Sequence, residues 1–397
     1  MDSLRNPFAP GAGSPPPELA GRNTLLDEIL LEIARIRQGF PEKSSMLIGL
    51  RGVGKTVLLE RIRRLSEDAG CKTLMLEARE EKSLPALLAP ELKVLLLQLS
   101  NVERAKELAQ RALRGLVGFA KALKVKYGDI ELGWDVAPES GLADSGDLHL
   151  DLRSLMMAVG QAAQAAGSAA VFLIDELQYV KPRELEALVM ALHLVGQRTL
   201  PVTVVGAGLP QLRGNLGDAK SYAERLFTFR TIGPLSREAT SEAIGRPIRA
   251  QGENIEDDAV TEIYEQTKGY PYFIQEWGKH VWRAAQRSPI TRAEVRVASQ
   301  TAQAALDHSF FGVRFDRLTP SERKYLRAMA TFGDVSCRSG EIASVLGKKM
   351  QALSPIRSKL IRKGMVWSPE HGDTAFTVPL FGEFMCRIMP GDDWMHE

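Results

Sequence analysis

The chain has 397 residues, of which 44% are hydrophobic and 25% charged, and its formal net charge is +2. At roughly 150 residues per domain, this length predicts two or three domains. The small net charge excludes a basic chain, so any surface for nucleic acid must be local. The most apolar region, SLPALLAPELKVLLLQL, contains two prolines and two charges, which predicts a buried helix and not a membrane span.

Cysteine usage and the first residues indicate the compartment. The three cysteines, Cys71, Cys337 and Cys386, are far apart and form no metal spacing or disulfide framework. This favours a reducing, cytoplasmic location. Residues 1–17 are rich in Pro and Gly and lack the apolar core of a signal peptide, so we expect a flexible tail there.

Residues 18–235 have the pattern of an α/β domain. Near-continuous apolar runs that alternate with helical segments predict a parallel sheet covered on both faces. The five runs are SSMLIGL (44–50), KTLMLEA (72–78), VFLID (171–175), VTVVGAG (202–208) and FTFRTI (227–232). Residues 80–150 are interpreted as an insertion, with a helix followed by a hairpin at Gly128-Asp129. The basic face of that helix is more often a solvated surface than a binding site.

The remaining chain predicts two further domains. Residues 236–310 are helical throughout and are expected to form a lid. Residues 311–397 predict a helix that begins at Thr319-Pro320, two shorter helices and a two-stranded wing around His371-Gly372-Asp373. This order is typical of a winged helix.

A phosphate-binding loop follows the first apolar run. Residues 49–56, GLRGVGKT, match G-x-x-x-x-G-K-[ST] between a predicted strand and a predicted helix. Glycines let backbone N–H groups point at phosphate, Lys55 is expected to reach the β- and γ-phosphates, and the Thr56 hydroxyl to bind Mg²⁺. The predicted nucleotide contacts are Gly49, Arg51, Gly52, Val53, Gly54, Lys55, Thr56 and Val57.

An acidic pair follows the third apolar run. VFLIDELQYV places Asp175 and Glu176 at the carboxyl end of a buried strand, where open parallel sheets bind ligands. Asp175 is expected to hold Mg²⁺ through water, and Glu176 to polarise the attacking water. The pair favours hydrolysis of ATP over phosphate transfer by a small-molecule kinase.

Together these motifs resemble the AAA+ superfamily, and more narrowly the branch shared by origin-recognition initiators and STAND signalling ATPases. ELAGRNTLLDEI (18–29) is similar to the entry motif of this branch, which implies that Arg22 lies near the adenine. YAERLFTFRTIGPLS (222–236) resembles the segment in which these ATPases carry an arginine for a neighbouring subunit, and Arg225 matches it best. TKGYPYFIQEWGKHVW (267–282) resembles the Gly-x-Pro lid motif, which includes Pro271.

Two departures from that family favour a slow switch over a fast motor. The polar residue usual at the tip of the strand after the acidic pair is replaced by Ala207 between glycines, and Thr203 comes too early. The lid offers Tyr270 and Tyr272 where initiators carry an arginine, with Arg246 as a distant candidate. Among the other residues, His193 and the lid aromatics are interpreted as core.

The predicted second helix of the winged helix is basic. From Arg338 to Lys363 there are seven Lys or Arg residues and one acid, Glu341, which is the footprint expected for phosphate contacts. An alternative is that the winged helix packs beside the lid, as is common in STAND proteins, and touches no DNA. The candidate DNA contacts are Lys348, Lys349, Arg357, Lys359, Arg362 and Lys363.

The sequence therefore predicts an ATP- and Mg²⁺-dependent switch with slow ATPase activity, whose output is double-stranded DNA binding. Self-assembly through Arg225 would complete the hydrolytic site. The alternative is a STAND-type signalling ATPase whose output is protein association, with an effector on a separate chain. No membrane partner is expected.

Overall fold

The structure is a computed structural model of the chain, and it describes residues 1–11, 13–124, 137–370, 372–391 and 393–395. The contacts within the chain divide it into two compact units. The sheet unit comprises Asn23–Ile48 and Leu58–Thr231. The lid unit comprises Met1–Arg22, Gly49–Val57 and Ile232–Glu397, so it includes the phosphate loop.

A five-stranded parallel sheet forms the centre of the sheet unit, with the strand order β2-β3-β4-β1-β5. All five strands predicted from the apolar runs are confirmed. Because the strands are parallel, their carboxyl ends share one edge of the sheet. The strands are β1 (Ser44–Ile48), β2 (Lys72–Glu77), β3 (Ala170–Asp175), β4 (Val202–Gly208) and β5 (Phe227–Thr231).

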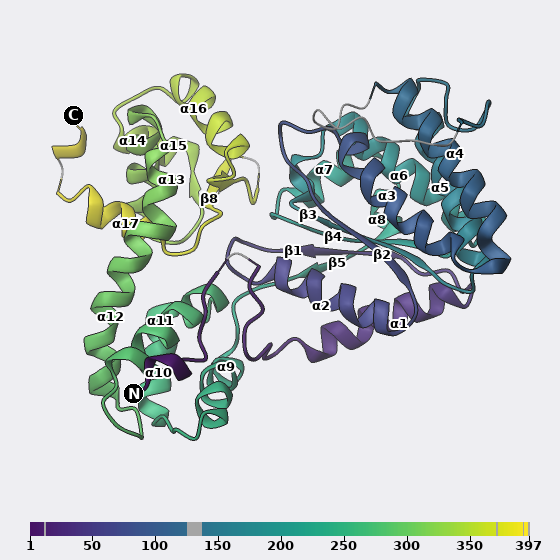
Figure 1. Cartoon of the computed structure of the whole chain (residues 1–397). Helices are drawn as coiled ribbons and strands as arrows, with labels where there is room; N and C mark the ends of the chain where they lie inside the picture. Colours follow the sequence, from purple (N-terminus) through teal and green to yellow (C-terminus); the bar gives the residue numbers. More distant parts are fainter. Residues whose placement is uncertain (12, 125–136, 371, 392, 396–397) are drawn as a thin grey trace. The chain divides into compact units, whose positions relative to one another are not determined.

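Helices cover both faces of this sheet (Figure 1). Alternate strand residues belong to different faces: Phe172 and Ile174 join the large core cluster with the helices of one face, whereas Val171 and Leu173 are buried outside that cluster. On that first face lie α3 (Leu84–Ser100), α4 (Lys106–Ala122), α5 (Leu148–Ala165), α6 (Pro182–Gln197) and α7 (Leu212–Ala219), while α1 (Asn23–Arg37) and α2 (Lys55–Asp68) lie on the other. The short α8 (Ala223–Leu226) precedes β5.

The lid unit has a single hydrophobic core that continues from the lid helices into the C-terminal domain. An aromatic cluster joins the two parts, in which the rings of Tyr272 and Phe310 stack with centroids 4.8 Å apart and Phe311 stacks on Phe384 at 5.2 Å. The lid helices are α9 (Arg237–Ala250), α10 (Asp257–Thr267), α11 (Pro271–Ala284) and α12 (Arg292–Leu306), followed by a π-helical turn (Asp307–Gly312) and α13 (Val313–Asp316).

The C-terminal domain contains the predicted helix after Thr319-Pro320, two further helices and the two strands of the predicted wing, together with a third strand and a last helix that were not predicted. In chain order it contains α14 (Pro320–Ala330), β6 (Cys337–Arg338), α15 (Ser339–Val345), α16 (Met350–Arg362), β7 (Val366–Trp367), β8 (Asp373–Phe376) and α17 (Phe381–Ile388). The three strands form an antiparallel sheet in the order β6-β8-β7. Thr319 caps α14 through a capping box with Glu322. The helix α16 begins at Met350, so Pro355 lies inside the helix and not at its start.

The first residues correct the expectation of a flexible tail. The Phe8 ring is buried and lies against Gly278 of α11, where a Cβ would meet the ring at 2.7 Å. The indole of Trp282 donates to the Asp2 carbonyl at 2.8 Å, and the Asn6 amide donates to the Lys279 carbonyl at 3.0 Å. The buried Phe8 ring and these hydrogen bonds together attach the Pro/Gly-rich segment to the lid. The predicted hairpin at Gly128-Asp129 lies outside the described residues.

Candidate nucleotide site

The phosphate loop connects β1, which ends at Ile48, to α2, which begins at Lys55. Gly52 and Gly54 have φ values of 79° and 88°, in the left-handed region that favours glycine. Gly49 is required for a different reason, because a Cβ there would lie 2.2 Å from the Ile232 carbonyl oxygen. The glycines therefore allow the tight curl that places a helix N-terminus and loop N–H groups around an anion.

Lys55 is buried within this loop. Its side chain is 7% exposed, and Nζ donates to the carbonyl oxygens of Gly49 and Leu50 at 2.8 Å each. These carbonyls hold the ammonium at the first turn of α2, close to the loop N–H groups that the motif uses for phosphate. Val53 is buried beneath the loop, and Thr56 is exposed at the start of the helix.

The Gly-Tyr-Pro motif of the lid contacts the phosphate loop. Gly269 has φ 75°, and a Cβ there would lie 2.3 Å from the Leu235 carbonyl oxygen, so only glycine fits. Pro271 occupies the first position of α11. The next residue, Tyr272, donates its backbone N–H to the Gly52 carbonyl at 3.2 Å. The N-terminus of α11 is thus attached to the loop, and burial raises the pKa of the Tyr272 phenol.

The C-terminal domain contacts the same loop at Arg51. The Arg51 backbone N–H donates to the Thr377 carbonyl at 3.0 Å, and Arg51 Nε donates to the Gly364 carbonyl at 3.5 Å. The Thr377 hydroxyl donates to the Gly364 carbonyl, which connects the two acceptors. Sequence analysis missed Thr377, because nothing in the pattern relates a residue after β8 to a loop more than 300 positions earlier.

Arg22 is the last residue of the first segment of the lid unit. Its guanidinium donates to the Gly233 carbonyl, and burial lowers its pKa from the usual arginine value. Gly21 precedes it with φ 70°, and a Cβ there would lie 2.8 Å from the Ala239 Cβ. The Gly-Arg pair thus fixes the turn by which the chain leaves the lid.

In the sheet unit, β3 delivers Asp175 and Glu176 to the carboxyl edge of the sheet. Asp175 is 4% exposed, and its Oδ1 accepts the Glu176 N–H at 2.8 Å. Glu176 has φ 52° and ψ 37°, a left-handed conformation that is uncommon outside glycine. Such strain is retained mainly at functional sites. The carboxylate of Glu176 accepts a hydrogen bond from the Gln178 amide.

Gln178 is a residue that sequence analysis missed. Its Oε1 accepts the Leu209 backbone N–H at 3.0 Å, so one side chain joins Glu176 to the end of β4. The available signal was a polar residue two positions after the acidic pair in an otherwise apolar stretch. Thr203 lies at the start of β4, where its hydroxyl is 3.3 Å from that of Ser44, far along the strand from this edge.

The two arginines considered for catalysis have different surroundings. Arg225 ends the short helix α8 and is exposed, and within the described part of the chain its guanidinium has no hydrogen-bond or ion-pair partner. Arg246 instead pairs with Glu18 at 3.1 Å and with Glu242 at 3.2 Å. Of the lid aromatics, Phe273 and Trp277 are core residues at 1% exposed each, whereas Tyr270 and Tyr272 are half-buried against that core.

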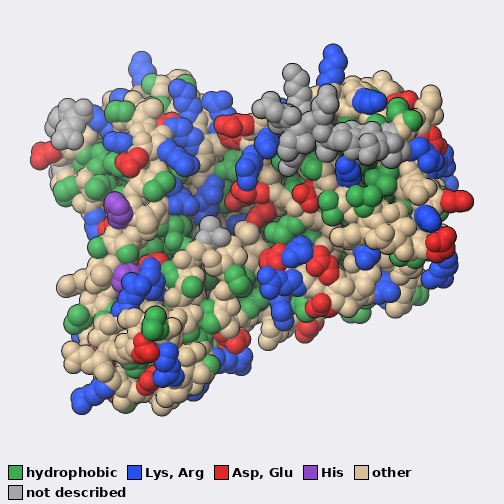
Figure 2. All heavy atoms as spheres, in the orientation of Figure 1, with side chains coloured by type: hydrophobic (Ala, Val, Ile, Leu, Met, Phe, Trp, Pro, Cys, Tyr) green, Lys and Arg blue, Asp and Glu red, His purple; other side chains and the backbone are tan. Residues whose placement is uncertain are grey.

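The basic residues of the C-terminal domain divide into two groups. Arg357 donates to the Thr374 hydroxyl at 2.8 Å and to the Asp373 carbonyl at 2.7 Å, and Lys363 pairs with Glu322 at 2.7 Å. These two candidates have internal contacts that connect α16 to its surroundings. The other four side chains are exposed, and Figure 2 shows Lys and Arg side chains on the face that carries α16. They are Lys348, Lys349, Lys359 and Arg362.

Comparison with known proteins agrees with this geometry. Residues 18–205 match the AAA ATPase domain family. Residues 18–205 are an AAA+ P-loop ATPase domain. Residues 308–385 of the same chain match a domain family of unknown function. No curated protein matches the sequence. In the described residues, no helix is both long and apolar enough to cross a membrane, and no cluster of three metal-binding side chains is found.

Solved structures similar to this chain extend over most of its length. A Walker-type ATPase of Pyrococcus abyssi shares 16% identity at a TM-score of 0.56, covering 92% of this chain and 96% of that one. The Orc1 protein of Aeropyrum pernix, solved in complex with DNA, shares 16% identity at a TM-score of 0.49, and the match covers 97% of this chain and 96% of that one. The RuvB branch-migration motor of Thermotoga maritima shares 16% identity at 0.42, covering 94% and 96%. At this identity, the likeness to the Walker-type ATPase concerns the fold alone.

Proposed function

We propose that this AAA+ ATPase is a slow, ATP- and Mg²⁺-dependent switch whose nucleotide state controls a C-terminal winged helix that binds double-stranded DNA. The observation that carries the proposal is the contact between the phosphate loop and the C-terminal domain. Arg51, inside the loop, donates its N–H to Thr377, directly after β8. A change in the loop on nucleotide binding would therefore alter a contact of the output domain.

The residues around the loop fit a nucleoside triphosphate with Mg²⁺. The left-handed glycines and the helix N-terminus supply N–H donors for the phosphates, and Lys55 supplies a cation held at the loop. We assign the Thr56 hydroxyl and the Asp175 carboxylate to the metal, and Glu176 to the attacking water. When bound, the ion would neutralise charge that develops on the phosphoryl oxygens.

Slow hydrolysis is supported by one feature of each unit. The tip of β4 carries Ala207 between glycines, and Arg246 is paired with two carboxylates of its own surroundings. Fewer charged or polar groups for the transition state mean less electrostatic stabilisation. A ligand shifts a conformational equilibrium only by its differential affinity for the two states, so a slow ATPase can hold the ATP state long enough to act.

The exposed cations of α16 and the preceding turn support DNA as the partner. Lys348, Lys349, Lys359 and Arg362 are exposed and lie within 15 residues of one another, with no acid among residues 348–362. Phosphate contacts by such side chains give salt-dependent, sequence-independent affinity. Arg357 and Lys363 are assigned to the packing of the domain.

The test is the fluorescence anisotropy of a labelled random duplex across a salt series. We expect Glu176→Gln, which should retain ATP, to bind more tightly in ATP than in ADP or without nucleotide. Replacing Lys359 and Arg362 by alanine should lower the slope of log K against log salt by about 2. The control removes two exposed lid cations, Arg283 and Arg287, and should leave the slope unchanged.

A second candidate is a STAND-type ATPase whose output is protein association. The internal contacts of Arg357 and Lys363, together with the docking of Thr377 on the loop, favour a packing role for the C-terminal domain. Absence of duplex binding in every nucleotide state would contradict the DNA proposal and favour this one. Light scattering in ATP and ADP would then detect the assembly.

A further inference from the structure

Gln178 connects two parts of the sheet unit that bear on hydrolysis. Its amide nitrogen donates to a carboxylate oxygen of Glu176, and its amide oxygen accepts the N–H of Leu209 at 3.0 Å. Leu209 directly follows β4, and Glu176 directly follows β3. The side chain therefore spans the ends of two neighbouring strands of the sheet.

The backbone around Glu176 is shaped for this contact. The left-handed conformation at Glu176 turns the chain immediately after β3, and the Glu176 carbonyl accepts the Tyr179 N–H at 3.0 Å to close a short 3-10 turn, Leu177–Tyr179. This turn places Gln178 two residues along the chain from the carboxylate that it contacts. The surrounding contacts must offset the cost of this conformation.

The glycines of β4 make room for the turn. A Cβ at Gly206 would lie 2.6 Å from a Leu177 methyl carbon, and one at Gly208 would lie 2.7 Å from the Gln178 amide oxygen. Glycine at positions 206 and 208 therefore leaves the space in which the Gln178 amide reaches Leu209. The absence of a polar side chain at the tip of β4 and the presence of Gln178 are two aspects of one packing arrangement.

We propose that Gln178 is the positioning residue of the hydrolytic site, which fixes the orientation of the Glu176 carboxylate from the end of β4. This proposal rests on the proposed role of Glu176 in polarising water. A glutamine amide can donate at one end and accept at the other. Its donor end orients the carboxylate, and its acceptor end anchors the amide to a backbone group that does not move independently of the strand.

Two nearly isosteric substitutions separate these ends. Gln178→Met removes both hydrogen bonds. Gln178→Glu retains an oxygen that accepts the Leu209 N–H and replaces the donor by a second carboxylate beside Glu176, which repels it. A purely structural role predicts that Gln178→Glu is the milder change. A positioning role predicts that it is at least as harmful to hydrolysis as Gln178→Met.

The experiment measures kcat for ATP and the Kd of a fluorescent ATP analogue for wild type, Gln178→Met, Gln178→Glu and Glu176→Gln. We expect both Gln178 variants to lose at least tenfold in kcat while Kd changes less than twofold. The control is Gln197→Met, which removes another glutamine that contacts a side chain four residues away, His193. Wild-type kcat in Gln178→Glu, or a proportional loss of affinity and kcat, would overturn the proposal.

The result for Glu176→Gln separates this proposal from the one on which it rests. If Glu176→Gln hydrolyses ATP at the wild-type rate, the role assigned to Glu176 is wrong, and that of Gln178 with it. If Glu176→Gln is inactive while both Gln178 variants retain wild-type kcat, only the inference on Gln178 is overturned.

Discussion

Lys55 is the residue on which the proposed nucleotide binding depends most directly. Its ammonium is held by two loop carbonyls in a buried position, so its charge is set at one place before a phosphate arrives. Preorganised charge of this kind contributes more than a mobile surface lysine would. The identity of this residue was predictable because the motif fixes it, whereas its carbonyl partners depend on the curl of the loop.

Variants of Lys55 and Glu176 should affect different steps, the first ATP binding and the second ATP hydrolysis. We expect Lys55→Ala to weaken ATP binding by about 10- to 100-fold, since a hydrogen bond to a charged group contributes roughly 1.5–3 kcal/mol. Glu176→Gln should leave affinity unchanged and lower kcat by about 100-fold or more. Isothermal titration and a phosphate-release assay measure the two effects, with Lys121→Ala, an exposed lysine on α4, as control. Unchanged ATP affinity in Lys55→Ala would contradict the assignment of the site.

The contact partners of several site residues could not be predicted from the sequence. Thr377 contributes a carbonyl oxygen, and any amino acid has one, so its type carries no signal. Gln178 was visible as a polar residue, but its partner Leu209 follows another strand, more than 30 positions along the chain. Arg357 was counted as a DNA contact from its charge, although its surroundings occupy it internally.

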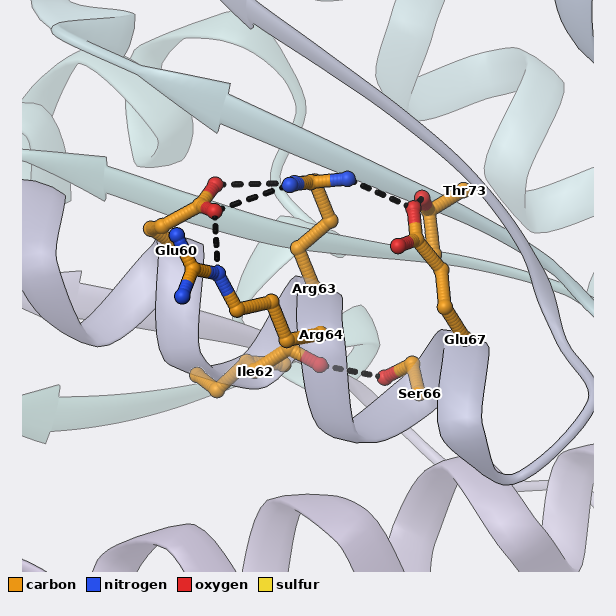
Figure 3. A network of polar contacts seen from close by, with 7 residues as sticks. All are labelled: Glu60, Ile62, Arg63, Arg64, Ser66, Glu67 and Thr73. Atoms are coloured by element: carbon orange, nitrogen blue, oxygen red, sulfur yellow. Dashed lines mark hydrogen bonds and ion pairs between the residues drawn. The ribbon is translucent and has the colours of Figure 1, made fainter.

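At the scale of elements, α2 carries a surface network of ion pairs beyond the phosphate loop (Figure 3). Glu60 accepts from Arg63 at 2.8 Å and from Arg64 at 2.7 Å, and Arg63 also contacts Glu67 at 2.7 Å. The hydrogen bond from Arg63 is the main reason that the pKa of Glu60 falls to about 2. These pairs follow the i, i+3 and i, i+4 spacing of a helix, which the sequence already contains.

This network predicts a pH-dependent contribution to stability. Because the pKa of Glu60 is lowered in the folded state, its contribution is present above pH 4.5 and is lost as pH falls towards 2. Each such surface pair contributes roughly 0.3–0.5 kcal/mol. Glu60→Gln should therefore lower Tm by a few degrees at pH 7, and the difference should vanish near pH 2. A difference that persists unchanged at low pH would contradict the ionic origin.

The packing of the first residues against the lid helices is a second feature that should contribute to stability. We expect Phe8→Ala to cost up to about 3 kcal/mol, the lower end for a buried phenylalanine, because the segment can detach instead of leaving a cavity. Thermal unfolding measures this, with Leu4→Ala as control, since Leu4 is 96% exposed. Equal Tm values for the two variants would show that Phe8 does not hold the segment.

The types of the elements could be predicted where the hydrophobic pattern determines them. The predictions failed where individual residues have more influence than the composition of their segment. The five strands follow from apolar runs that must be buried on both faces. Residues 1–17 were expected to be flexible because Pro and Gly dominate their composition, but the Phe8 ring packs directly against Gly278. Pro355 lies inside α16, which starts five residues earlier at Met350, although a proline inside a helix lacks the N–H for the usual hydrogen bond.

At the scale of the whole molecule, Arg225 bears on assembly. It is exposed on α8, in the sheet unit, and the described residues hold no partner for it. If it completes the site of a neighbouring copy, kcat should rise with protein concentration, and Arg225→Ala should remove that rise with a loss of at least tenfold. Arg198→Ala, another exposed arginine of this unit, is the control. A kcat independent of both concentration and Arg225 would indicate a monomeric ATPase.

The effect of nucleotide on the contact between the phosphate loop and the C-terminal domain is measured most directly by amide hydrogen exchange. We compare Glu176→Gln in ATP, in ADP and without nucleotide, with Lys55→Ala as the variant that should not respond. The Arg51–Thr377 contact predicts that ATP speeds amide exchange in peptides covering residues 364–380 relative to the nucleotide-free state, because the loop turns its N–H groups towards phosphate. If ATP protects the phosphate loop while those peptides exchange identically in all three states, nucleotide does not control the C-terminal domain.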